Sequence, residues 1–420
     1  MSDSIHSVTM GVALLLVVWP TTAGAQTPSA SPTVETIPVP SGGDAADDMA
    51  IWVHPTQSAL SLVIATDKQS GLVVYDMGGN RLQYLPDGSL NNVDIRTGFP
   101  LMGDEVALVT SGERDQDRLA IYAVDPLARS LVPVAARDIA LGIEVYGCCM
   151  YSSPWTGDTY FFCTSEDGLV QQWRLFPAGA GTTVDAELVR GFDVGSVSEG
   201  CVADDENAYL FVAEEGEGIW RYGAEPGAGT ARALVDTTGG TGHLAADVEG
   251  LGIYYAPGGA GYLVASSQGD NTFVVYERRP PHERRLTFQI AANAGLGIDA
   301  VSETDGIDVT SVRLGSAFPS GLFVAQDGSN PGANQNFKFV PWQDIAELAD
   351  PPLLGAASGP GGGDGGGGGG GGGCSFALAR DGHPPNGDPS LVLTIAAVLT
   401  VLVVRRSRVR GASSSRRPVL

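Results

Sequence analysis

Short apolar runs alternate with turns of Gly, Asp, Asn and Pro between residues 34 and 353, and helical periodicity is almost absent. Short apolar runs that are bounded by such turns are typical of β-strands. We therefore predict an all-β domain with strands at residues 50–53, 62–66, 72–76, 106–110, 119–124, 159–164, 170–175, 209–213, 218–222, 261–266, 272–277 and 321–325.

Most of these strands form pairs that look alike. In each pair, an apolar strand runs into a polar or acidic turn with Gly and then into a second strand that carries an aromatic residue, as in SLVIATDKQSGLVVYDMGG and YLFVAEEGEGIWRYGAE. The pairs begin near residues 62, 106, 160, 209 and 262, a repeat of about 50 residues. A hairpin at this spacing is typical of a β-propeller, and residues 34–353 are long enough for six blades. The alternative, a large β-sandwich, does not account for the matching turns.

Charge narrows the class of protein. The chain has a formal net charge of −24, with 24 Lys and Arg against 48 Asp and Glu. Seven basic residues and only two acids follow residue 373, and one acid, Asp3, precedes residue 26, so residues 26–373 carry 17 basic and 45 acidic side chains. A nucleic acid is held by clustered Lys and Arg, so we expect no nucleic-acid partner. An extracellular acidic domain that binds cations fits this composition.

The beginning of the chain is typical of a secretory signal. An apolar run at residues 11–19 precedes Ala23-Gly24-Ala25, which fits a cleavage site, although no Lys or Arg precedes the run. We assign residues 1–25 to a signal peptide and residues 26–33 to a linker. An N-terminal anchor is the alternative.

The end of the chain combines a Gly-rich linker at 354–373 with a tail at 374–420, which contains Cys374, an apolar run at 391–404 and an Arg cluster. This order resembles the C-terminal sorting tails of myxobacterial surface proteins, and the resemblance implies processing at the cysteine and display on the cell surface. A plain tail anchor is the alternative. We expect a secreted monomer that contacts the membrane through this tail only.

Four cysteines lie inside the domain, at positions 148, 149, 163 and 201. In an oxidising compartment they permit one or two disulfides, and four cysteines allow three pairings. Buried free thiols are the alternative.

Acidic residues gather in the turns of the predicted hairpins, which should meet at the mouth of the central channel. Asp67-Lys68, Glu113-Arg114-Asp115, Glu166-Asp167, Glu214-Glu215 and Gln268 occupy these turns. Converging carboxylates repel one another, so we expect positive charge among them. Irregular shells of carboxylate and carbonyl oxygens are typical of Ca²⁺. The sequence has no HExxH zinc motif, no GxxxxGK[ST] phosphate loop and no GxSxG elbow.

A family resemblance rests on seven motifs that run in order from Asp44 to Trp342: DAADDMAIWVHP, LNNVDIRTGFPL, SEGCVADDE, ADVEGLGIYYA, ASSQG, ETDGIDV and ANQNFKFVPW. Together they resemble the β-propeller phytases, a calcium-dependent family that hydrolyses inositol hexakisphosphate. The resemblance implies a six-bladed propeller, several Ca²⁺ ions, and phytate or calcium phytate as the substrate.

The resemblance also implies roles for individual residues. The positions that match active-site calcium ligands are Asp47, Asp48, Glu199, Glu215, Asp247, Glu249 and Asp305, with Tyr146 beside them. Asn91 and Asp94 match positions near a channel calcium, and Asp299, Asn334 and Asn336 match a structural calcium. Lys68 and Arg114 match residues that contact substrate phosphate, and Asp167 and Gln268 are further expected substrate contacts. One departure is that Glu166-Asp167 replaces the Lys-Glu pair of the family, which removes one phosphate-binding cation.

These assignments predict a metal-centred reaction. Calcium ions would present positive charge to phosphate oxygens, and a water bridging two ions would attack phosphorus while Lys68 and Arg114 hold the phosphate. No protein nucleophile is required. Two other classes compete: a non-catalytic calcium-dependent adhesin or lectin, which has no use for these two cations, and a propeller lactonase with one central calcium, which has fewer mouth carboxylates.

Overall fold

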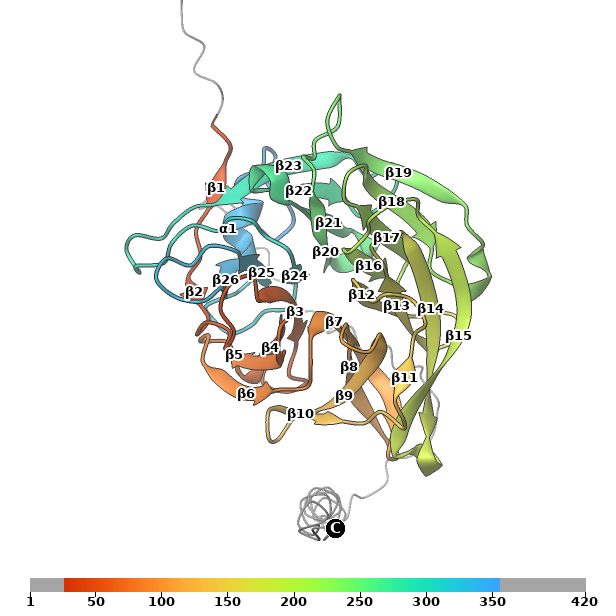
Figure 1. Ribbon diagram of the computed structural model, residues 1–420. Helices are drawn as coiled ribbons and strands as arrows, with labels where there is room; N and C mark the ends of the chain where they lie inside the picture. Colours follow the sequence, from red (N-terminus) through yellow and green to blue (C-terminus); the bar gives the residue numbers. More distant parts are fainter. Residues whose placement is uncertain (1–25, 356–420) are drawn as a thin grey trace, which may run out of the picture. The chain divides into compact units, whose positions relative to one another are not determined.

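The computed structural model describes residues 26–355, which form six β-sheets around a common centre (Figure 1). The first two blades contain β3 (Ala46–Trp52), β4 (Leu62–Asp67), β5 (Gly71–Asp76) and β6 (Arg81–Leu85), then β7 (Leu90–Leu101), β8 (Asp104–Glu113), β9 (Arg118–Asp125) and β10 (Ser130–Pro133), with β11 (Ile139–Ala140) also paired to β9. Blades three and four contain β12 (Cys148–Ser152), β13 (Thr159–Thr164), β14 (Leu169–Ala178) and β15 (Thr183–Asp193), then β16 (Cys201–Asp204), β17 (Tyr209–Glu214), β18 (Gly218–Gly223) and β19 (Arg232–Thr237).

The last two blades use strands from both ends of the domain. Blade five contains β20 (Val248–Tyr255), β21 (Gly261–Ser267), β22 (Thr272–Glu277) and β23 (Arg284–Ile290), with β1 (Ser29–Ala30) added parallel to β23. Blade six contains β24 (Ile307–Thr310), β25 (Leu322–Asp327) and β26 (Asn336–Pro341), and its fourth strand is β2 (Val34–Glu35). The helix α1 (Trp342–Ala346) follows β26.

The first strands of the blades form a closed ring. Each of β3, β7, β12, β16 and β20 contacts the first strand of the next blade, and β24 contacts β3 again. The predicted all-β, six-bladed propeller is therefore confirmed.

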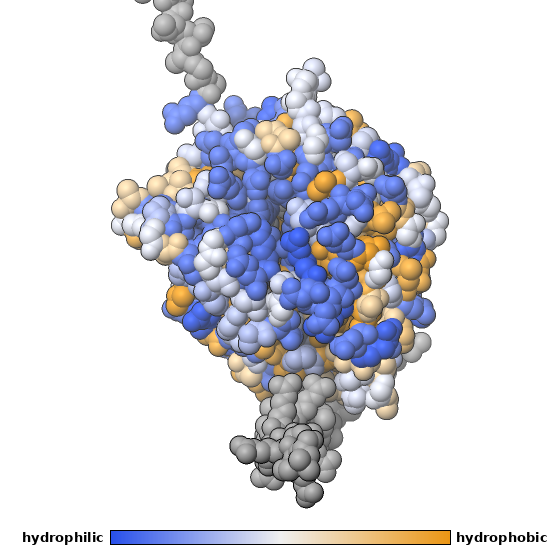
Figure 2. Space-filling view, viewed as in Figure 1, coloured by the Kyte–Doolittle hydropathy of each residue, from blue (hydrophilic) through white to orange (hydrophobic). Residues whose placement is uncertain are grey.

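Apolar side chains fill the interfaces between neighbouring blades, and each of the six interfaces has its own buried cluster. Between blades five and six, the rings of Phe273 and Phe323 meet edge to face with centroids 5.2 Å apart. Burying a side chain of this size contributes about 1.5–3 kcal/mol. The polar ends of the strands, by contrast, reach the surface, and hydrophilic residues dominate the middle of the face in Figure 2.

The strand predictions were selective. All twelve predicted segments overlap observed strands, and apart from 50–53, which overlaps β3, they fall on the second and third strands of the blades. The other first strands and all the fourth strands were missed. The segment predicted as a linker, 26–33, contains β1.

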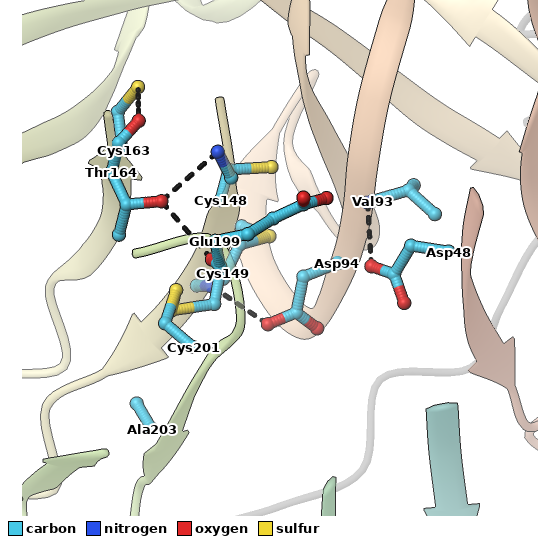
Figure 3. Close-up of a disulfide and its surroundings, with 12 residues drawn as sticks. Asp48, Val93, Asp94, Cys148, Cys149, Cys163, Thr164, Glu199, Cys201 and Ala203 are labelled. Atoms are coloured by element: carbon cyan, nitrogen blue, oxygen red, sulfur yellow. Dashed lines mark hydrogen bonds between the residues drawn. A yellow bond between two sulfur atoms is a disulfide. The ribbon is translucent and has the colours of Figure 1, made fainter. Parts of the chain in front are cut away.

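One disulfide forms among the four domain cysteines. Cys149 in β12 and Cys201 in β16 are bonded across the first strands of blades three and four (Figure 3). Cys148 and Cys163 are buried free thiols that face each other in the register of β12 and β13.

The predicted signal peptide, the tail and nearly all of the Gly-rich linker lie outside the described residues. Within residues 26–355, no helix is both long and apolar enough to cross a membrane.

Candidate active site

Lys68 lies at one side of the channel mouth, in the turn directly after β4. Its Nζ atom is 3.0 Å from Asp44 Oδ1, 3.3 Å from Asp47 Oδ1 and 3.0 Å from Asp305 Oδ2. Gln268 Nε2 donates to the other oxygen of Asp305 at 2.6 Å. Burial alone would lower the pKa of Lys68, but the carboxylates of Asp47 and Asp305 raise this pKa above its usual value. Lys68 is therefore a fixed cation in this acidic mouth.

Three glutamates at the strand ends of blades four and five form the second part of the site. Oxygens of Glu199, Glu215 and Glu249 lie within 4.8 Å of one another. Glu199 precedes β16, Glu215 follows β17, and Glu249 lies in β20, so the ends of neighbouring strands bring them together. Burial raises the pKa of Glu199 and Glu249 well above the usual range, and raises the pKa of Glu215 to about 7. Three carboxylates this close repel one another when ionised, and a bound cation would stabilise their ionised forms.

Tyr146 joins the glutamates to Arg114. Its hydroxyl interacts with Glu199 and Glu215, and burial together with the nearby Glu199 raises the pKa of Tyr146. The Arg114 guanidinium carbon lies 5.4 Å from the centre of the Tyr146 ring, close enough for a cation–π contact. Asn91 Nδ2 donates to Glu199 Oε1 at 2.8 Å and to the Tyr146 carbonyl at 2.7 Å. The tyrosine thus remains a hydrogen-bond donor between the basic and the acidic parts of the mouth.

The two parts belong to one site. Asp47 and Asp305 contribute to the raised pKa of Glu199, and Lys68 opposes them. Burial, then Asp47, raises the pKa of Asp305 itself to about 7. Asp247 follows a cis peptide bond, accepts a hydrogen bond from Gln268 N through its carbonyl at 2.9 Å, and acts on Glu215 electrostatically. The structure therefore brings most of the predicted active-site residues into one acidic basin.

The residues present fit a hard metal ion such as Ca²⁺. The side-chain atoms of the basin that could bind a metal ion are carboxylate and amide oxygens, the ligands that Ca²⁺ prefers. Asn91 Oδ1 and Glu215 Oε1 are buried and accept no hydrogen bond from the described residues. A buried acceptor without a partner costs about 1–3 kcal/mol, and a metal ion would remove that cost.

Asp48 and Asp94 lie in β3 and β7, the first strands of blades one and two. Both line a cavity together with Cys148 and the Cys149–Cys201 disulfide (Figure 3). Asp48 Oδ2 accepts from Val93 N at 3.1 Å, and Asp94 Oδ2 accepts from Met150 N at 2.7 Å. Asn91 was predicted to lie near Asp94, but its amide donates to Glu199 instead. Its neighbour Asn92 lines the cavity.

Two of the three residues predicted to hold a structural calcium, Asp299 and Asn336, lie beside a lysine. Buried Lys338 contacts Asp299, and its Nζ atom is 2.8 Å from Glu35 Oε2 and 3.2 Å from Asp327 Oδ2. Asn336 Nδ2 donates to the same oxygen of Glu35 at 3.2 Å.

Asn334 has different partners, the carbonyls of Val39 and Pro40 at 3.0 and 3.1 Å. Glu35 and Asp327 were not predicted here. The one feature of the sequence that could have pointed to this cluster was Lys338, because the chain contains only two lysines.

The third hairpin completes the mouth. Arg114 Nη2 lies 3.5 Å from Glu166 Oε1, and Asp167 follows in the same turn between β13 and β14. The predicted phosphate-binding arginine is therefore paired with the acid that replaces the lysine of the family pattern.

The chain is similar to several known proteins. The family model described as Phytase matches residues 6–355. The 3-phytase of Bacillus subtilis (strain 168) is 45% identical over 322 residues, which cover 74% of this chain and 83% of that protein. Among solved structures, an auxiliary nutrient binding protein from Bacteroides thetaiotaomicron has a TM-score of 0.45 and 12% identity, covering 71% of this chain and 69% of its own. The Cps50 (Swd1) β-propeller domain of Myceliophteria thermophila has a TM-score of 0.39 and 9% identity, covering 70% and 83%. The family match and the B. subtilis relative extend over most of the chain, which belongs to the phytase family.

Proposed function

We propose that this phytase hydrolyses inositol hexakisphosphate to phosphate and lower inositol phosphates, and that Ca²⁺ is the metal it uses. The observation that carries the proposal is the meeting of Glu199, Glu215 and Glu249 beside Lys68 and its carboxylates. A site this acidic repels a polyanionic substrate unless metal ions reverse its charge.

The chain's own residues define where the ions and the substrate would lie. The ions would be held by the oxygens of the basin, namely Asp47, Glu199, Glu215, Asp247, Glu249 and Asp305. When bound, Ca²⁺ supplies positive charge that attracts phosphate oxygens and makes nearby water more acidic. Asp48 and Asp94 offer further oxygen ligands in the channel, and Asp299 and Asn336 offer them beside Glu35.

Lys68 and Arg114 bind the phosphate that is cleaved or its neighbour. Lys68 acts as a point charge, and Arg114 offers a planar pair of N–H donors. Tyr146 keeps its proton because burial and the nearby Glu199 raise its pKa, so its single O–H can donate to one of the two glutamates, Glu199 or Glu215. Gln268 holds Asp305 in the same way.

Water is the nucleophile. Its oxygen forms a bond to phosphorus, the bond between phosphorus and the inositol oxygen breaks, and the leaving oxygen takes up a proton from water. Cysteine is a poor alternative, because burial raises the pKa of Cys148 and Cys163 and keeps both as thiols.

The test is phosphate release from phytate by the purified chain in calcium, in excess chelator, and after calcium is restored. We expect release, loss and recovery in that order. Full release in chelator would contradict the dependence on metal, and no release in calcium would contradict the function itself.

We also propose that the domain works outside the cytoplasm as a monomer, attached to the cell surface by its tail. The signal-like segment 1–25 and the tail 374–420 support this location, and the Cys149–Cys201 disulfide is compatible with an oxidising compartment. Protease digestion of intact cells should remove the activity, whereas activity that survives digestion and appears only after lysis would contradict surface display. Gel filtration of residues 26–355 should give the monomer mass.

A further inference from the structure

Glu166 forms an ion pair with the guanidinium of Arg114, the residue that we expect to bind a substrate phosphate. We propose that Glu166 limits the affinity for substrate, because it pairs with Arg114 in the substrate-free enzyme and competes with the incoming phosphate for it. This inference rests on the proposed function, since it concerns how the same mouth binds a polyanion.

The pair joins turns of neighbouring blades. Arg114 directly follows β8 in blade two, and Glu166 lies between β13 and β14 in blade three. Their closest atoms are 3.5 Å apart, and the side chains are 35% and 50% exposed. An ion pair this exposed is weak and exchanges readily with solvent or another anion. A phosphate, which carries more charge and can accept two N–H bonds from arginine, can therefore displace the carboxylate.

Arg114 is also close to the reacting part of the site. It lies over the Tyr146 ring, and Tyr146 contacts Glu199 and Glu215. Glu166 is near enough to act on Glu215 electrostatically. The competition therefore takes place beside the metal-binding oxygens rather than at a remote surface.

The fold does not need the carboxylate. Among residues 26–355, the pair with Arg114 is the one polar side-chain contact of Glu166. The turn is formed by backbone, with Gly168 N donating to Ser165 O at 3.0 Å. Replacing the carboxylate by an amide should leave the turn unchanged.

Charge explains why the effect reaches the substrate. Of the two cations predicted to contact phosphate, Lys68 already faces three carboxylates and Arg114 faces Glu166. Neutralising Glu166 leaves the Arg114 guanidinium free to bind a phosphate.

The test is Glu166→Gln in the full chain with calcium. We expect KM for phytate to fall about two- to fivefold with kcat little changed, which corresponds to the worth of an exposed ion pair. Binding of inositol hexasulfate, a polyanion without a phosphate to cleave, should tighten by the same factor in calorimetry. Glu166→Lys should tighten it further, and added salt should reduce each difference.

Two further variants separate competition from general effects. In an Arg114→Ala background, Glu166→Gln should change KM and hexasulfate affinity much less, because no guanidinium is left for the Glu166 carboxylate to compete for. The matched control is Glu187→Gln, which breaks the Arg174–Glu187 pair on β14 and β15 of the same blade, where the side chains are 38% and 51% exposed. This control should leave KM unchanged.

The outcomes distinguish the inference from the function. If phytate is hydrolysed but Glu166→Gln changes neither KM nor hexasulfate binding, or the change persists without Arg114, the inference is wrong and the function stands. If hexasulfate binding tightens as expected but no phosphate is released by any variant, the function is wrong and the competition at Arg114 stands.

Discussion

The Cys149–Cys201 disulfide offers a sharp test of how the ring is held together. It connects the first strands of blades three and four, and its cysteines are 52 positions apart in sequence. Cross-linking a loop of this length reduces the entropy of the unfolded chain by an amount that corresponds to ~4 kcal/mol in the loop-closure relation, and measured disulfides usually contribute about 2–4 kcal/mol. Changing both cysteines to Ala should therefore lower the free energy of unfolding by about 2–4 kcal/mol.

Activity should be affected much less than stability. Glu199 is only two residues before Cys201, but a second contact holds its backbone. The Glu199 carbonyl accepts a hydrogen bond from Thr164 Oγ1 at 3.1 Å, and Thr164 Oγ1 in turn accepts one from Gly147 N at 3.0 Å (Figure 3). This contact remains without the disulfide. We expect phosphate release at 25 °C to stay within about twofold of the wild-type rate, because the two substitutions remove none of the carboxylates that would bind metal.

The assay is urea unfolding followed by circular dichroism, with phosphate release measured on the same samples. The matched control changes the free thiols Cys148 and Cys163 to Ala, which removes two buried sulfur atoms without removing a cross-link. Equal destabilisation of the two double variants would refute the cross-link argument. A large loss of activity in the Cys149/Cys201 variant with unchanged stability would refute the role given to Thr164.

Four other outcomes are expected. Glu199→Gln should lower the rate of phosphate release at least ~10²-fold with an unchanged circular dichroism spectrum, as removal of a group that organises transition-state charge does; a near-normal rate would remove this residue from the site. Lys68→Ala should raise KM or lower kcat without unfolding, and a variant with unchanged kinetics would contradict its contact with phosphate. Chelation should lower the melting temperature reversibly, because a ligand present at about 100 times its Kd contributes ~2.7 kcal/mol. Arg278→Met should cost about 3–5 kcal/mol in urea unfolding, since it leaves the buried carboxylate of Asp204, now 2.7 Å from Arg278 Nε, without its partner; a loss below 1 kcal/mol would contradict that expectation.

The sequence predicted the second and third strands of most blades because they are buried on both faces and read as continuous apolar runs, as in Leu62–Asp67. First strands were mostly missed because they form the inner ring of the propeller and interrupt their apolar residues with polar ones, as Cys201–Asp204 does with a cysteine and an aspartate. Fourth strands were missed for another reason. They are partly exposed, and Arg232–Thr237 has no buried residue to signal a strand.

The site was more predictable in membership than in arrangement. Acids in hairpin turns pointed to one mouth, and the structure places Glu199, Glu215 and Glu249 there. The partners of each side chain depend on contacts between blades, which a single sequence does not encode locally. The position of Asn91 on Glu199 and the meeting of Glu35 with Lys338, 303 positions away, are contacts of this kind.

The closure of the last blade sets the order in which the molecule can be completed. Val34 pairs with Phe339 and Glu35 with Lys338, so the outer strand of blade six is synthesised near the start of the domain, whereas its partner β26 is the last strand. Until residue 341 has been synthesised, the chain can form only an open arc of blades with unpaired strand edges at both ends. Such edges can pair with another chain, and contacts this distant in sequence form slowly. A short N-terminal strand therefore determines when the whole ring, including the mouth that its first strands surround, becomes a finished enzyme.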